Sequence, residues 1–137
     1  MVYLFIFNFF LFFNYFFTDL ENCNKMLTLN LYSIICFNAH QSIEKALKAL
    51  AYKMGENFNT KSSNLIDLYN LVSKYIDCTS DIEHKLYKIE NYFYSARLPD
   101  QHKQPIIPSQ FFTIMHATEA IQLAETFSTK VSHIVNN

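Results

Sequence analysis

Two lysines and a glutamine lie on one side of a stretch that is rich in Ala, Leu, Glu and Lys. Gln41, Lys45 and Lys48 recur at steps of four and three residues, so a helix places all three on the same face. Two ammonium groups and an amide at this spacing could hold a di- or triphosphate. The same pattern also fits a solvated helix face carrying a Glu44–Lys48 pair worth about a few tenths of a kcal/mol. From these residues alone, the solvated face is the simpler interpretation.

The one arginine in the chain, Arg97, is the second candidate. It lies near the predicted end of a helix, where the helix dipole favours a cation and where pairing with Asp100 or Glu90 is an ordinary structural role. Its planar fork could also bind phosphate in a way that lysine cannot reproduce. We favour the phosphate role, because a Pro-flanked loop holds Arg97 beside Tyr94.

The helix that must position the lysines is predicted over residues 28–54, and Gly55 supplies a left-handed C-terminal stop. Apolar residues at steps of three and four form its core face: Cys36, Ala39, Ile43, Ala46, Leu47, Leu50 and Met54. Phe37 and Tyr52 lie on the same side of this helix as Gln41, Lys45 and Lys48. Phe37 fits a helix–helix interface between two subunits better than it fits water. His40 borders the core face, and we interpret it as a packed or interface residue rather than a ligand.

Three further helices complete the predicted fold. One begins after an Asn64 cap with Asp67 in its first turn, and the next follows a Ser80–Glu83 capping box and ends at Leu98, before Pro99. The last is capped by Thr113. All three prolines lie in residues 98–112, a long loop of the kind that is usually functional. We therefore predict an all-α fold, an antiparallel four-helix bundle with up to five helices and this Pro-containing loop before the last one.

Composition narrows the possible functions. A chain of 137 residues forms one domain, and a single Gly excludes a Gly-rich phosphate loop. A net charge of −1 gives no general attraction to DNA or to a membrane. The three cysteines show no metal-ligand spacing and no HExxH motif occurs, so we expect no metal and no required cofactor. A reducing, cytoplasmic setting is the expectation.

Residues 1–17 carry no charge and contain eight of the 14 Phe residues. Their length approaches that of a spanning helix. Three interpretations compete: a membrane anchor, an extra packing helix, or upstream sequence translated ahead of a start at Met26. We favour the last, with residues 19–25 as a polar linker. The domain then covers residues 26–137, and membrane association is expected only if the segment is a true anchor.

Several short blocks together resemble the HEPN family (higher eukaryote and prokaryote nucleotide-binding) over residues 30–135. They are Phe37–Ala49, Asn64–Leu68, Ala96–Asp100, Phe112-Thr113, Ala117, Glu119–Ile121 and Ala124-Glu125. In style the chain is similar to the eukaryotic branch found in sacsin. The resemblance implies a helical bundle, frequently a homodimer, that binds nucleotide. It assigns Gln41, Lys45, Lys48, Arg97 and Asp100 to a nucleoside triphosphate or a related anion.

The chain departs from the family pattern at four positions. Leu98 replaces a usual Tyr, Ser63 stands where many members have His, and Met115 and His116 replace an acidic pair. The predicted fold is compatible with all four changes. The identity and affinity of the ligand do not follow from the resemblance at these positions.

Three functions follow from the resemblance and its departures. The first is a non-catalytic nucleotide-binding and dimerisation module, with Phe37, His40 and Tyr52 at the interface, in a larger chaperone-like protein. The second is a metal-independent endoribonuclease using Arg97 and His102, which match the family's Arg-x4–6-His pattern although Pro99 interrupts it. The third is a structural interaction domain whose site has decayed.

Overall fold

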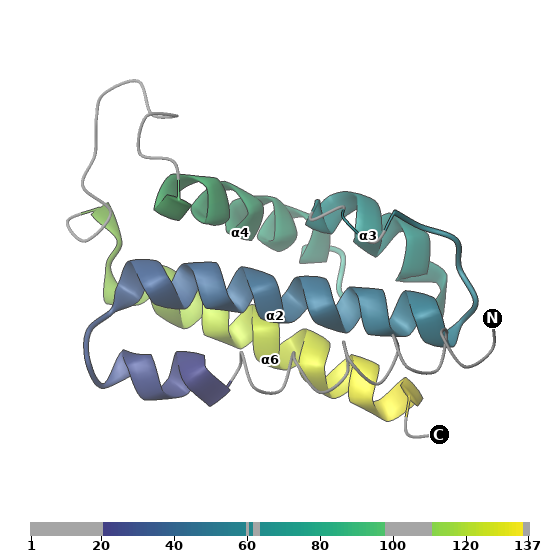
Figure 1. Ribbon diagram of the computed structural model, residues 1–137, viewed down its shortest axis with the longest axis horizontal. Coiled ribbons are helices and arrows are strands. Elements are labelled where there is room, and N and C mark those ends of the chain that lie inside the picture. Colours follow the sequence, from purple (N-terminus) through teal and green to yellow (C-terminus); the bar gives the residue numbers. More distant parts are fainter. Residues whose placement is uncertain (1–20, 60, 62–63, 98–110, 136–137) are drawn as a thin grey trace.

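The computed structural model describes residues 21–135 except 60, 62–63 and 98–110. Its helices are α2 (Tyr32–Lys53), α3 (Leu65–Val72), α4 (Ile82–Arg97) and α6 (Ile114–Val135), and a short 3₁₀ turn, η1 (Ser73–Tyr75), follows α3. Residues 21–27 are helical as well. No strand occurs in the described part of the chain, which confirms the predicted all-α bundle. Figure 1 shows α2 running through the middle, with α3 and α4 along one side and α6 along another.

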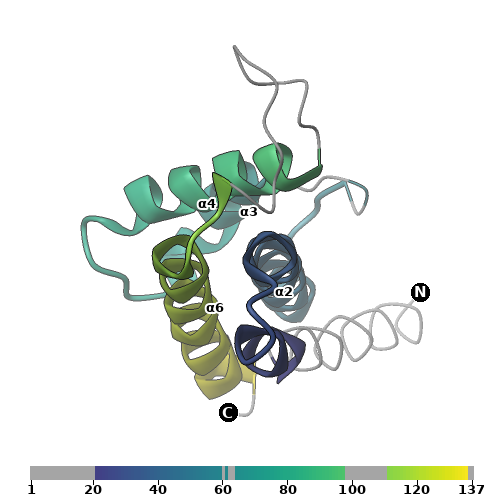
Figure 2. The ribbon, with the colours of Figure 1, turned by 90° about the vertical axis from the view of Figure 1, so that its left-hand side faces the viewer.

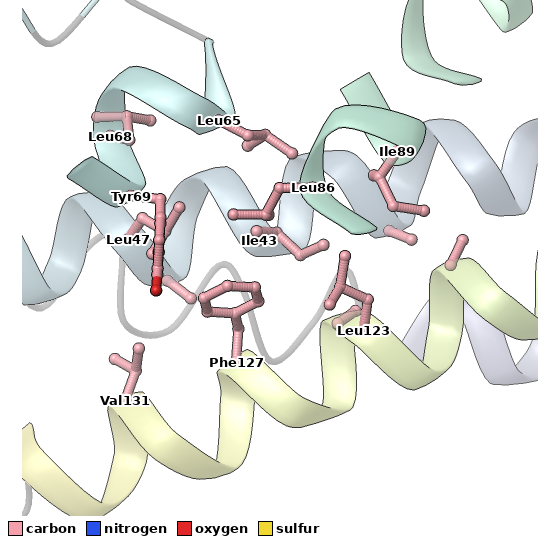
Figure 3. Packing of buried hydrophobic residues seen from close by; sticks show 14 of the residues in the cluster. Ile43, Leu47, Leu65, Leu68, Tyr69, Leu86, Ile89, Leu123, Phe127 and Val131 are labelled. Atoms are coloured by element: carbon pink, nitrogen blue, oxygen red, sulfur yellow. The ribbon is translucent and has the colours of Figure 1, made fainter. Parts of the chain in front are cut away.

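The core forms around α2, which packs most extensively against α6. Small residues on both helices permit this close approach: Ala39 and Ala46 on α2, and Ala117, Ala120 and Ala124 on α6, all buried. Phe127 of α6 is fully buried and points toward α2 and α4 (Figure 3). Its ring meets Tyr69 of α3 edge to face at 6.2 Å between centroids. Phe127 therefore joins α6 to the helices on the other side of the core.

The N-terminal boundary differs from the prediction. The first long helix begins at Tyr32 rather than Thr28, and residues 21–27 form helix rather than a polar linker. Cys23 is fully buried, and Met26 and Leu27 pack against the core, so this short helix has an apolar face at steps of three and four. Asn30, at φ 57°, takes the left-handed conformation that separates the two helices.

Most predicted helix ends are confirmed. The Asn64 side chain accepts hydrogen bonds from the backbone N–H groups of Ile66 and Asp67, at 3.0 and 3.1 Å. Gly55 has φ 73° just after α2. Besides the start of α2, the start of α4 differs: the Asp81 carbonyl accepts the first helical hydrogen bond from the Lys85 N–H. Asp81, not Ser80, therefore occupies the N-cap position.

Candidate functional site

The polar face of α2 is less exposed than its sequence predicts. Gln41 and Lys45 are half-buried, whereas Lys48 is only 4% exposed. Lys48 Nζ lies 3.8 Å from Glu44 Oε1, and Glu44 is itself buried. The placement of both lysines on an exposed face is therefore wrong for Lys48. The reason is that α3, α4 and α6 all pack against α2 and leave little of it in contact with water.

Burial perturbs both members of the Glu44–Lys48 pair. Loss of hydration raises the pKa of Glu44 above its ordinary value, and the nearby charge of Lys48 opposes this shift. Burial lowers the pKa of Lys48, and Glu44 opposes that shift in turn. Lys48 is thus held inside the bundle by a carboxylate of its own helix, which removes it from the groups that can reach a ligand in solution.

A second buried carboxylate, Glu90 of α4, joins three helices. Its Oε2 lies 3.0 Å from His40 Nε2 on α2 and accepts a hydrogen bond from the Leu65 N–H, at 3.0 Å, at the start of α3. His40 has 0% exposure. Of the two roles predicted for His40, packing is the one that this placement fits, and the side chain is not accessible to a second subunit. Sequence reasoning named Glu90 only as a possible partner of Arg97.

Arg97 and the lysines lie far apart along the bundle. The His40–Glu90 contact sets the register of α2 and α4, which run in opposite directions (Figure 1). Arg97 ends α4, seven residues past Glu90, and Lys48 lies eight residues past His40. At 1.5 Å per residue these steps add to roughly 22 Å. The backbones of Arg97 and Lys48 therefore lie far apart along the bundle axis, and an anion shared by their two side chains stays a prediction.

The remaining predicted site residues divide into two groups. Phe37 and Tyr52 are half-buried, and the Tyr52 ring meets Phe58 edge to face at 5.0 Å, so an interface role for either stays a prediction. Asp100 and His102 lie outside the described residues, as do Leu98 and Ser63. The Arg-x4-His arrangement therefore also stays a prediction.

His116, one of the departures from the family pattern, has a structural role that the sequence did not reveal. Its Nδ1 accepts a hydrogen bond from the Thr113 N–H at 3.1 Å and lies 3.0 Å from the Thr113 hydroxyl oxygen. Phe111 stacks on the His116 ring, with 5.6 Å between centroids. His116 thus does what a glutamate does in a capping box: it satisfies the N–H of the cap residue.

A cleft of about 420 Å³ between α4 and α6 was also not predicted. Lys85 and Lys88 border it on α4, and Lys130 borders it on α6. The spacing of Lys85 and Lys88, three residues apart on one helix, was the only signal that could have indicated it.

The described residues contain no group of His, Cys, Asp or Glu side chains that could hold a metal ion. None of the helices described is both long and apolar enough to span a bilayer. Residues 1–17, for which an anchor was considered, lie outside this part of the chain.

Comparison with known proteins places this geometry in a family. A search of curated proteins finds no match. Among solved structures, the chain is similar to TT1696 from Thermus thermophilus, with a TM-score of 0.78 and 24% identity over 89% of this chain and 94% of that one. It is also similar to ST0689, an archaeal HEPN homologue, with a TM-score of 0.73 and 21% identity over 90% and 94%. The family model of the HEPN domain matches residues 17–134, and the chain belongs to the HEPN domain family.

Proposed function

We propose that this chain is a nucleotide-binding and dimerising helical module, and that the phosphates bind along α2 at Gln41 and Lys45. The observation that carries the proposal is how little of α2 reaches solvent. Among residues 35–51, all of which the structure describes, only Phe37, Asn38, Gln41 and Lys45 are not buried. Phe37, Gln41 and Lys45 recur at steps of four, and Asn38 lies three residues before Gln41, so the four form a single row on one side of the helix.

The row offers an aromatic ring, two amides and an ammonium group. Asn38 Nδ2 donates a hydrogen bond to the sulfur of Met26 at 3.3 Å. We propose Gln41 and Lys45 as the phosphate-binding residues, because an amide and an ammonium group can both donate hydrogen bonds to phosphate oxygens. Membership of the HEPN family supports a nucleotide as the ligand, as the family's name implies. Lys48 lies inside the bundle, where its charge is paired with that of Glu44. A direct phosphate contact is proposed for Lys45 and not for Lys48.

Isothermal titration calorimetry with ATP and GTP tests the site. The Gln41→Ala plus Lys45→Ala variant is expected to bind at least about tenfold more weakly, since a charged hydrogen bond is worth about 1.5–3 kcal/mol. Lys53→Ala, at the exposed end of the same helix, is the matched control and should bind like the wild type. Lys48→Ala is unsuitable, because it leaves Glu44 buried without its cation. Equal affinity of the double variant and the wild type would refute the site.

Dimerisation is tested separately by sedimentation velocity. Phe37 is half-buried within one chain, and we propose that a second copy covers the remainder of its ring. Phe37→Lys should shift the protein from dimer to monomer, whereas Tyr87→Lys, on the exposed side of α4, should not. A wild type that sediments as a monomer at high micromolar concentration contradicts the proposal. Placement in a larger chaperone-like protein of the sacsin type stays a prediction.

A further inference from the structure

We propose that the cleft between α4 and α6 binds a small amphipathic anion, meaning a molecule with an apolar body and one carboxylate, sulfonate or phosphate end. Residues of α4 and α6 line this cleft, and Figure 2 shows α4 crossing over α6, with the N-terminal end of α4 past that helix. The volume of the cleft is about 420 Å³, which is within the range of small-molecule pockets. None of the described residues that line it belongs to α2, so the site is separate from the nucleotide row.

The floor of the cleft is apolar and fixed. Ile82, Ile89 and Leu123 line it, and each is a core residue with at most 4% exposure, so the floor does not depend on mobile side chains. The aliphatic stems of lysine side chains extend the apolar surface up the walls. A ligand body that contacts this floor is therefore apolar.

The rim of the cleft is positive on balance. Lys85, Lys88 and Lys130 supply three ammonium groups, against two carboxylates from Asp81 and Glu119. Lys85 pairs with Asp81 at 3.0 Å within one helical turn, and Lys88 pairs with Glu119 at 3.1 Å between the helices. Exposed ion pairs of this kind contribute little to the stability of the fold. Either lysine can therefore leave its carboxylate and bind a ligand at a small cost in free energy.

Lys130 marks the place of the anionic end. Its ammonium donates a hydrogen bond to the backbone carbonyl of Asp77, a neutral acceptor that does not cancel the charge. Thr79, Asp81 and Ile82 at the start of the 16-residue α4 lie in the same lining, so the positive end of the helix dipole adds to the field there. An anion near Lys130 and the α4 N-terminus leaves the apolar body over Ile89 and Leu123.

Amide chemical-shift mapping tests the proposal, with the full chain and 8-anilinonaphthalene-1-sulfonate (ANS) as the probe. Saturable shifts are expected at Thr79, Gln122 and Thr126. Lys85→Glu plus Lys130→Glu reverses the rim charge and should weaken binding by about tenfold or more. Lys25→Glu plus Lys53→Glu makes the same charge change away from the cleft and should leave affinity within about twofold. Gln122→Trp, at an exposed lining position, should block binding sterically without changing charge.

Two outcomes overturn the proposal: ANS shifts confined to residues outside the lining, or unchanged affinity in both the Lys85/Lys130 and the Gln122 variants. Inorganic phosphate is the second probe. If it competes with ANS as well as octyl phosphate does, the apolar floor contributes nothing and the amphipathic claim is wrong. ATP titration of the same variants separates this site from the α2 row, because each site can fail while the other keeps its ligand.

Discussion

Removal of the Glu90 carboxylate should destabilise the protein more than any exposed acidic substitution. Glu90→Ala deletes the acceptor that His40 and the Leu65 N–H share, each at 3.0 Å. His40 is fully buried and Leu65 has 0% exposure, so water does not replace the lost partner without opening the bundle. Hydrogen bonds to a charged group are worth about 1.5–3 kcal/mol each. Removing one partner of a buried pair costs about 3–5 kcal/mol, and we expect a loss in this range.

Thermal and urea unfolding measure this loss. With an unfolding entropy of about 2 cal/mol/K per residue, each kcal/mol of lost stability lowers the Tm of a 137-residue chain by about 3 to 4 °C. We therefore expect the Tm of Glu90→Ala to fall by roughly 10–17 °C. Glu125→Ala, an exposed glutamate on α6, is the control and should change Tm by about 2 °C or less. The His40→Ala plus Glu90→Ala variant should lose about 1–3 kcal/mol less than the two single losses combined. A Glu90→Ala variant as stable as Glu125→Ala would show that this carboxylate does not join the helices.

Four other predictions concern individual side chains. Lys48→Met should cost about 2–4 kcal/mol in urea unfolding by leaving Glu44 buried and charged, and adding Glu44→Gln should restore most of it. Because the folded state holds the Glu44 proton more tightly than the unfolded state does, wild-type stability should fall as pH rises from 4.5 through the raised folded pKa. Glu44→Gln should remove that slope. His116→Glu should retain the cap of α6 and melt like the wild type, whereas His116→Ala should lose about 1 kcal/mol. In the native protein, Ellman's reagent should label half-buried Cys78 first and Cys36 only on unfolding, since burial raises the pKa of Cys36 to about 12.

Local sequence signals predicted the helix ends well because each end depends on residues within one turn. Asn64 caps its own helix two and three residues ahead, and Gly55 needs only its own freedom to take φ 73°. The Ser80 prediction failed by one residue because Ser80 and Asp81 are both good caps, and the sequence does not decide which one begins the helix. The short helix over residues 21–27 was missed because four of its seven residues are polar: Glu21, Asn22, Asn24 and Lys25.

Periodicity also identified the core face of α2, except for Met54, which follows the helix and is 38% exposed. It did not predict how many neighbours the helix has. A helical-wheel projection separates apolar from polar positions, and its usual interpretation is that the polar side is exposed to water. In this fold α3, α4 and α6 surround α2, so Lys48 and Glu44 lie inside although their positions are polar. Gln41 and Lys45 are partly exposed. Whether they could share a ligand with Arg97 depends on the register between α2 and α4, which the sequence does not give. That register depends on His40 and Glu90, which are 50 residues apart in sequence.

The enclosure of α2 limits where a ligand can bind this protein. A helix surrounded on most sides offers a ligand only the row that escapes packing, and here the polar members of that row are Asn38, Gln41 and Lys45. A second place on the described residues lies between two outer helices, where residues of α4 and α6 line a cleft. The two places use different lysines, Lys45 in one and Lys130 in the other. Charge reversal at each, measured against both ATP and ANS, therefore assigns each ligand to one place, and a variant that affects both ligands equally would show that the two places are not independent.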